Sequence, residues 1–270
     1  MISSRLGFMQ GRLSPVSRGV IQEFPWNFWQ KEFSIAHDLG FTLIEWTLDK
    51  KRLLENPLMT TNGQKKIKNL CKKHQVKIPS LTGDCFMQSP FWKLSGQNKK
   101  KRQQELQLIV IACSYLNIEK IVIPLVDNGS IESEDQSNAL IDFLNQKENF
   151  FKENNVSILF ESDFSPLRLK GFINELNPEV FGINYDTGNS ASLGYKVEEE
   201  FKSYGDRICN VHIKDRVLNG TTVPLGEGNA DFNKIFKALN RINYKGNFIL
   251  QTARDEDGNH SSVLEKYKSM

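Results

Sequence analysis

Long apolar runs, clustered cysteines and an excess of charge of one sign are all missing from this 270-residue chain. No segment approaches the roughly 20 consecutive apolar residues of a transmembrane helix, and the apolar run near the start is too short for the core of a signal peptide. The net charge is only +3, from 35 basic and 32 acidic residues, which argues against a dedicated nucleic-acid or membrane-surface binder. We therefore expect a cytoplasmic protein that binds neither nucleic acids nor membranes and is either monomeric or a homo-oligomer.

Cysteine is scarce and scattered. Cys71, Cys85, Cys113 and Cys209 form no C-x-x-C pair, although thiolate metal sites normally depend on such clustering. Disulfides are also unexpected in a reducing cytosol. We interpret all four cysteines as small buried apolar residues.

What the chain does contain is an alternation of short β-branched runs and longer amphipathic stretches. The runs predict eight strands, at residues 4–10, 41–46, 77–82, 120–126, 157–162, 181–186, 208–215 and 247–252. The amphipathic stretches predict a helix after each strand, at residues 26–39, 62–74, 99–116, 137–154, 167–176, 197–204, 232–242 and 261–267.

Strands that are separated by crossover helices must be parallel, and eight such units close naturally into a barrel. A doubly wound open sheet is the alternative, but no G-x-G-x-x-G follows the first predicted strand. The chain shows no linker or low-complexity segment. The sequence therefore predicts an α/β protein whose residues 1–270 form a single-domain (β/α)8 TIM barrel.

A polar residue follows the apolar run of each of the last four strands: Glu161, Asp186, His212 and Gln251. Late strand positions face the shared mouth of such a barrel, although each residue alone could simply cap a neighbouring loop. Two carboxylates, an imidazole and an amide oxygen suit Mn²⁺, Mg²⁺ or Co²⁺ better than Zn²⁺. The four positions together predict a divalent metal site.

Other polar and aromatic residues near strand ends are candidate substrate or catalytic groups. Glu45 ends the second strand and is a candidate second base. The candidate substrate-binding residues are Arg12, Trp46, Lys214, Asp215, Arg216 and Arg254. For some of them a structural role is equally open, since Lys214 could form a surface salt bridge, Asp215 could orient a metal ligand and Trp46 could pack a loop.

The chain resembles the xylose isomerase-like barrels, the sugar isomerase and epimerase group. The resemblance rests on Phe160-Glu161-Ser162, Asp186-Thr187-Gly188-Asn189, Val211-His212-Ile213-Lys214-Asp215 and the strand end from Phe248 to Arg254. The opening from Gly7 to Pro15 is similar to that of an uncharacterised branch. The resemblance implies that Glu161, Asp186 and His212 are metal ligands and that position 251, usually a glutamate, is the fourth.

Two positions depart from the family pattern. The family's epimerases use two metal-binding glutamates, one to remove a proton and the other to return it, and Gln251 is an amide that cannot exchange a proton near pH 7. It retains an oxygen for a metal. Asn189 stands where many members have a histidine that contacts the substrate, so Asn189 becomes a candidate substrate-binding residue.

The first hypothesis is a metal-dependent isomerase or epimerase that acts on a sugar or sugar derivative, phosphorylated or not, through an enediolate, with Glu161 moving the proton. A metal-dependent dehydratase or lyase of a polyol or keto-sugar is the alternative, because one base is sufficient for it. A non-catalytic sugar-binding barrel is the third. A DNA-repair endonuclease is disfavoured, because the chain has only four histidines.

Overall fold

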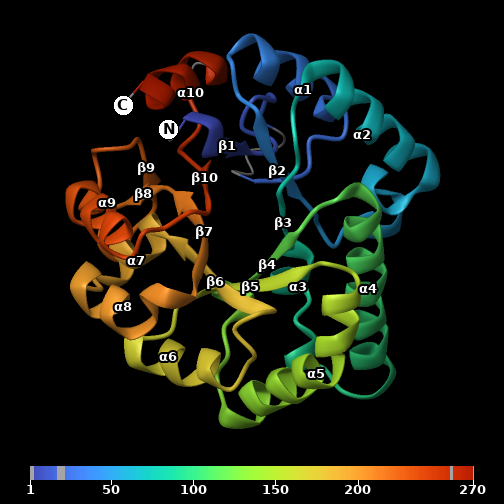
Figure 1. The fold of residues 1–270 in the computed structure, drawn as a ribbon, viewed down its shortest axis with the longest axis vertical. Helices are drawn as coiled ribbons and strands as arrows, with labels where there is room; N and C mark the ends of the chain where they lie inside the picture. The colour runs from blue at the N-terminus through green and yellow to red at the C-terminus, as the bar shows by residue number, and fades with distance from the viewer. Residues whose placement is uncertain (1–2, 17–21, 256–257, 270) are drawn as a thin grey trace.

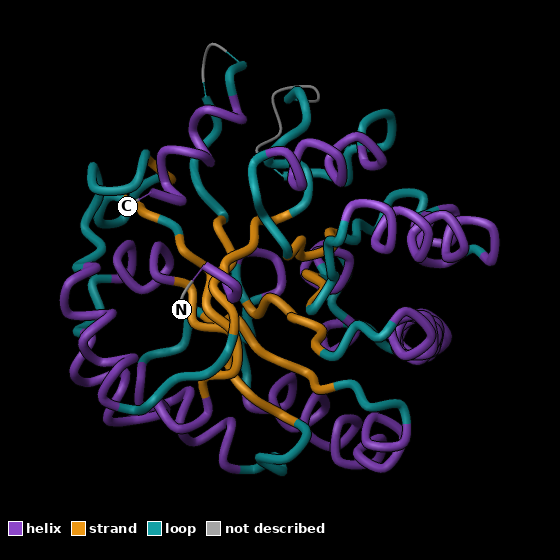
Figure 2. Tube along the Cα trace, turned by 45° about the horizontal axis from the view of Figure 1, so that its top comes forward, coloured by secondary structure: helices purple, strands orange, loops and turns teal. Residues whose placement is uncertain are grey.

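The computed structural model describes residues 3–16, 22–255 and 258–269, and its centre is a closed barrel of parallel strands. Neighbouring strands are hydrogen-bonded in the order β1-β10-β7-β6-β5-β4-β3-β2, and Figures 1 and 2 show the helices arranged around them. This confirms the predicted (β/α)8 fold. The barrel strands are β1 (Leu6–Met9), β2 (Leu43–Thr47), β3 (Ser80–Thr82), β4 (Lys120–Leu125), β5 (Ser157–Ser162), β6 (Phe181–Asp186), β7 (Ile208–Ile213) and β10 (Asn247–Leu250).

The main helices follow the strands as the periodicity predicts. They are α1 (Trp29–Asp38), α2 (Thr61–His74), α4 (Gly96–Leu116), α5 (Glu134–Glu153), α6 (Pro166–Asn174), α8 (Val197–Tyr204), α9 (Phe232–Arg241) and α10 (His260–Ser269). Lys268 of α10 donates to the carbonyl of Leu39 at 2.6 Å, so the last helix packs beside the first and closes the ring. In the described part of the chain, no helix combines the length and apolarity that crossing a bilayer requires.

Strand seven is shorter than predicted. It ends at Ile213, and Asp215–Arg216 form β8, which leaves the barrel and pairs antiparallel with β9 (Thr222–Val223). The predicted strand at 208–215 was too long because the sequence shows no break between the two segments. The eighth predicted strand, which is β10, also ends earlier than predicted, at Leu250, and this leaves Gln251 just beyond it.

Two short helices, α3 (Asp84–Gln88) and α7 (Thr187–Leu193), have no counterpart among the predicted elements. The segment of α7 is rich in small polar residues and has no apolar stripe, which is the signal that predicts a helix. Its start is fixed by Asp186, whose Oδ1 accepts from the amide N of Asn189 at 2.8 Å as an N-cap. The same residue therefore ends β6 and begins α7.

The register of the later strands brings their polar ends to one level. Asp186 on β6 is paired with His212 on β7, and His212 is paired with Ile249 on β10. Because the strands are parallel, residues near their C-terminal ends meet at the same mouth of the barrel. The fold thus places the predicted ligand residues on adjacent strands.

Candidate active site

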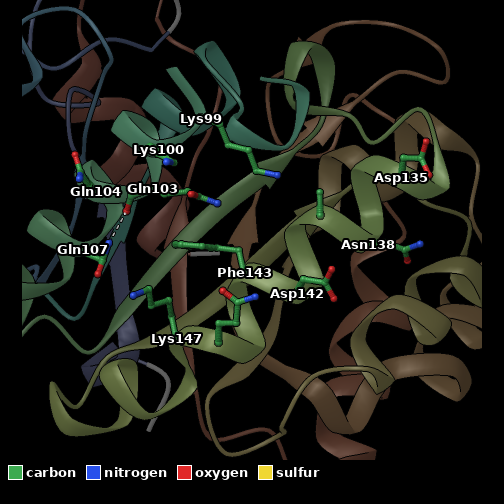
Figure 3. A pocket seen from close by; sticks show the side chains of 12 residues that line it. Lys99, Lys100, Gln103, Gln104, Gln107, Asp135, Asn138, Asp142, Phe143 and Lys147 are labelled. Atoms are coloured by element: carbon green, nitrogen blue, oxygen red, sulfur yellow. Dashed lines mark hydrogen bonds between the residues drawn. The ribbon is translucent and has the colours of Figure 1, made fainter. Parts of the chain in front are cut away.

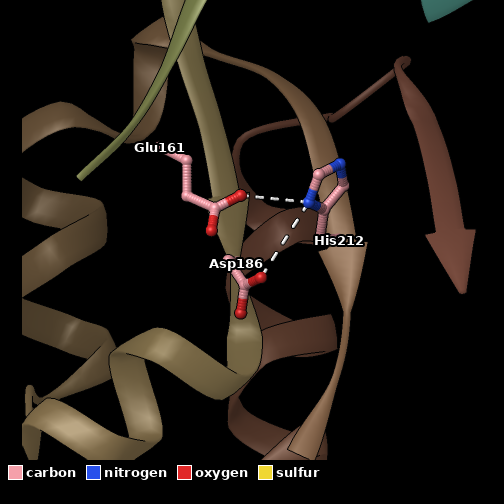
Figure 4. Close-up of side chains that lie close together, drawn as sticks. All are labelled: Glu161, Asp186 and His212. Carbon is pink, nitrogen blue, oxygen red and sulfur yellow. Dashed lines mark hydrogen bonds and ion pairs between the residues drawn. The ribbon is translucent and has the colours of Figure 1, made fainter. Parts of the chain in front are cut away.

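Three side chains from adjacent strands converge at this mouth. Nδ1 of His212 lies 3.1 Å from Oε2 of Glu161 and 3.9 Å from Oδ2 of Asp186. One ligand atom from each residue lies within 4.8 Å of the other two, and all three residues are buried. Figure 4 shows both carboxyl groups facing the same ring nitrogen of His212, while the other nitrogen is turned away. These three residues could together hold a metal ion.

Glu45 fixes the orientation of the His212 ring from inside the barrel. Its Oε1 lies 2.6 Å from Nε2 of His212, and its two oxygens also accept from Ser80 Oγ at 2.6 Å, Thr82 Oγ1 at 2.5 Å and Asn210 Nδ2 at 3.0 Å. Burial opposes the charged imidazole, but the adjacent carboxylates outweigh it and raise the pKa of His212 to about 10. Glu45 is fully buried. Its contacts position His212, and we therefore do not assign Glu45 as a base at the mouth.

Two asparagines hold the carboxylate of Glu161. Asn189 Nδ2 donates to Oε1 at 2.6 Å and Asn184 Nδ2 donates to Oε2 at 3.0 Å. Burial tends to raise the pKa of Glu161, but His212 and Lys214 together lower it below its ordinary value. The sequence reasoning missed Asn184, for which the available signal was a polar residue within an otherwise apolar strand.

One oxygen of Asp186 has no aligned hydrogen-bond donor among the residues that the structure describes. Its Oδ1 caps α7, whereas the buried Oδ2 lies 2.9 Å from Nζ of Lys214 without a well-directed hydrogen bond. Buried carboxylate oxygens normally have hydrogen-bond donors or coordinate a metal ion. The ligand atoms of Glu161, Asp186 and His212 therefore fit a divalent metal ion.

Gln251 is connected to the three candidate ligands through Lys214. Its Oε1 accepts from Lys214 Nζ at 3.1 Å, and the same ammonium group contacts Asp186. Its Nε2 donates to Oε1 of Gln22 at 2.9 Å. Gln251 thus lies beside the ligand cluster, and Gln22 joins the mouth from the β1–α1 loop without having been predicted.

The structure places three of the predicted substrate-binding arginines at the mouth. Arg12 donates from Nε to the carbonyl of Thr252 at 3.0 Å, and Arg254 donates to the carbonyl of Ser14 at 2.7 Å. These contacts join the loops after β1 and β10, as the adjacency of the two strands predicts. Arg216 donates to Oδ1 of Asn189 at 2.9 Å and thereby reaches the residue that holds Glu161.

Trp46 lies elsewhere. Its side chain is fully buried, its ring packs against Phe24 and Trp29, and its Nε1 donates to Asn56 at 3.1 Å. Successive residues of a strand face opposite sides, so Glu45 points into the barrel and Trp46 points out toward α1. We therefore remove Trp46 from the candidate substrate-binding residues.

Asp215 shapes the loop between β9 and α9. Its Oδ2 accepts from the backbone amides of Gly226 and Gly228 at 2.9 and 3.0 Å, and its Oδ1 accepts from that of Ala230 at 3.0 Å. A Cβ at Gly228 would lie 2.2 Å from Oδ1, so only glycine permits this close approach. Both oxygens are used by the backbone, and we assign Asp215 to the loop and not to the substrate.

We expect Asp215→Asn to lower the free energy of unfolding by about 1–3 kcal/mol, because an amide nitrogen would face a backbone N–H at a buried position. Thermal unfolding and hydrogen exchange of residues 224–230 measure this effect. Asp142→Asn on the exposed face of α5 is the matched control. Equal stability of the two variants would contradict this role of Asp215.

A groove of about 640 Å³ lies away from the mouth, between α4 and α5 (Figure 3). Lys99 and Lys100 line it together with Asp135 and Asp142. The lysines at the start of α4 thus share this groove with acidic residues of α5. The groove therefore carries charges of both signs.

Comparison with known proteins identifies related sequences and folds. Residues 33–269 match the family described as xylose isomerase-like TIM barrel. The L-ribulose-5-phosphate 3-epimerase UlaE of Salmonella heidelberg is 22% identical over 249 residues, which cover 88% of this chain and 87% of that protein.

Solved structures share the fold. The IOLI protein with a bound zinc atom has a TM-score of 0.74 at 16% identity, covering 98% of this chain and 96% of that chain. The 3-keto-D-glucoside 4-epimerase YcjR of E. coli, in its apo form, has a TM-score of 0.71 at 15% identity, covering 98% of this chain and 99% of that chain. At these identities the structural likeness concerns the fold alone. The sequence match, which extends over most of the barrel, confirms the predicted resemblance: this chain belongs to the xylose isomerase-like TIM barrel family.

Proposed function

We propose that this enzyme of the sugar isomerase and epimerase type uses a divalent metal ion to act on a sugar or sugar derivative. The observation that carries the proposal is the convergence of Glu161, Asp186 and His212, whose ligand atoms lie within 4.8 Å of one another. Sugar epimerases among the relatives support the same reaction class. The substrate is a small sugar, with or without a phosphate group.

Glu161, Asp186 and His212 would hold the metal ion, and Gln251 would offer its Oε1 as a fourth ligand. A bound divalent cation supplies Lewis-acid polarisation of a carbonyl oxygen and its neighbouring hydroxyl. An oxygen-rich set with one imidazole suits Mn²⁺, Mg²⁺ or Co²⁺ better than Zn²⁺. Lys214 lies within hydrogen-bond distance of Gln251 and close to Asp186, so its ammonium group contacts two of the residues that would hold the cation.

Glu161 is the residue that we assign to proton transfer. Its carboxylate is held in place by Asn184 and Asn189 and can accept the proton next to the sugar carbonyl. Asn189 and Arg216 form one hydrogen-bonded unit beside it and would orient the hydroxyl groups of the substrate. Arg12 and Arg254, from the loops on the other side of the mouth, would contact its distal end.

The amide at position 251 favours a second candidate function, a dehydratase or lyase. Epimerisation needs a group that returns the proton on the opposite face, and Gln251 cannot do so. Loss of a hydroxyl after enolisation needs only one base. Incubation of the Mn²⁺-loaded protein with a panel of aldoses and ketoses in deuterated water separates the two functions. After removal of the metal, NMR detects deuterium in an intact sugar if the protein is an epimerase, and an unsaturated or deoxy product if it is a dehydratase or lyase. If neither appears while a sugar binds, the proposal of an enzyme fails.

We expect Glu45→Gln to weaken Mn²⁺ binding by about 10–100-fold, because the carboxylate that orients the imidazole of a metal ligand raises its basicity. Isothermal titration calorimetry measures the affinity. Glu55→Gln is the control, since the side chain of Glu55 is 62% exposed. An unchanged affinity in Glu45→Gln would rule out this positioning role.

A further inference from the structure

The carboxamide of Gln22 lies between three polar side chains at the mouth of the barrel. Its Oε1 accepts from Arg12 Nη2 at 3.3 Å and from Gln251 Nε2 at 2.9 Å. Its Nε2 donates to Oδ2 of Asp84 at 2.6 Å. The carbonyl oxygen of this planar amide group thus accepts hydrogen bonds from two donors, and its N–H donates one to a carboxylate.

Arg12 and Gln251 come from two loops and Asp84 from the start of α3, and all three are more deeply buried than Gln22 itself. Arg12, Asp84 and Gln251 are 3%, 6% and 8% exposed, whereas Gln22 is only partly buried. Burial and the nearby Asp49 raise the pKa of Asp84 to about 7, and burial and Arg254 lower the pKa of Arg12 to about 9. Burying such groups costs free energy unless a polar partner satisfies them.

We propose that Arg12, Asp84 and Gln251 form a subsite for the acetamido group of an N-acetylated amino sugar, and that the Gln22 carboxamide occupies this subsite until the sugar binds. A secondary amide presents a carbonyl oxygen and an N–H in one plane, as the Gln22 amide does. A phosphate group in the same place would face the carboxylate of Asp84. The acetamido group therefore matches this lining better than an anion does.

The subsite adjoins the candidate metal site. Gln251 faces Gln22 through its Nε2 and Lys214 through its Oε1, and Lys214 contacts Asp186. A sugar whose acetamido group lies against Asp84 would therefore place its neighbouring carbons toward the metal ligands. The inference rests on the proposed function, since it names the substrate class of that site.

Binding of defined sugars to the Mg²⁺-loaded full-length protein tests the subsite. The probes are N-acetyl-D-mannosamine and N-acetyl-D-glucosamine, with D-mannose and D-glucose as the matched sugars without the acetamido group. We expect at least one acetamido sugar to bind about tenfold or more tightly than its parent hexose, measured by calorimetry or by ligand-observed NMR.

Two variants locate the interaction. Gln22→Ala removes the internal competitor and should tighten binding of the acetamido sugar by about tenfold, since the unoccupied subsite becomes the dominant state. Asp84→Leu removes the acceptor at similar volume and should weaken binding of that sugar at least tenfold while changing the affinity for the parent hexose little. Gln146→Ala, on the exposed face of α5, should leave both affinities unchanged.

Equal affinity for the acetamido and parent sugars, or no binding of any acetamido sugar to the wild type and to Gln22→Ala, overturns the inference. Metal titration of the same samples keeps the two proposals apart. If Mg²⁺ and Mn²⁺ bind but the acetamido group makes no difference, only the subsite fails. If acetamido binding depends on Asp84 while no metal binds, the subsite stands and the proposed metal-dependent function fails.

Discussion

Glu161→Gln is expected to lower the rate of proton exchange into the bound sugar by roughly 10²–10⁴-fold, the usual contribution of a positioned general base. The substitution keeps the size of the side chain and an oxygen for the metal, but the amide cannot accept a proton. The measurement is deuterium incorporation into whichever sugar of the panel exchanges with the wild-type protein.

The control for this prediction is Glu153→Gln at the exposed end of α5, which should exchange at the wild-type rate. The thermal unfolding temperature and the Mn²⁺ affinity of Glu161→Gln must be measured alongside the rate. A folded, metal-binding Glu161→Gln protein with undiminished exchange would show that another group removes the proton.

His212→Ala is expected to weaken Mn²⁺ binding by more than about 100-fold, because it removes a ligand and not merely the group that orients one. It should also destabilise the fold by about 3–5 kcal/mol, since the buried carboxylate of Glu45 loses its charged partner. Calorimetric metal titration and urea unfolding measure the two effects separately.

His212→Gln keeps a polar side chain opposite Glu45 and provides a folded variant if His212→Ala does not fold. His37→Ala, on the exposed face of α1, is the matched histidine control. Metal affinity in His212→Gln equal to that of His37→Ala would remove His212 from the metal site.

The predicted ligand positions could be read from the sequence because each follows an apolar run that ends at the barrel mouth. Glu161, Asp186 and His212 end or nearly end β5, β6 and β7; the register pairs Asp186 with His212, and the side chain of Glu161 reaches His212 from β5. Gln251 was assigned by the same pattern, but the structure places Lys214 between the side chain of Gln251 and the other three candidate ligands.

The roles of Glu45, Gln22 and Asp84 could not be read in the same way. Glu45 and His212 are 167 residues apart, and Gln22 and Gln251 are 229 residues apart. No local sequence pattern encodes such contacts, because they depend on which side chains the closed barrel brings together in its interior. Likewise Asp215 seemed to continue a strand, although its carboxylate binds the backbone of a loop up to 15 residues further along the chain.

The sequence by itself determined the alternation of strands and helices, the parallel closed barrel and the strands that carry the candidate metal ligands, because these depend on periodicity and on position within each strand. Only the tertiary structure decided which carboxylate faces the mouth, which one orients the histidine and which amide fills the space beside them. Those assignments depend on burial and on distances of a few ångström between segments far apart in the chain, which are set when the first and last strands pair.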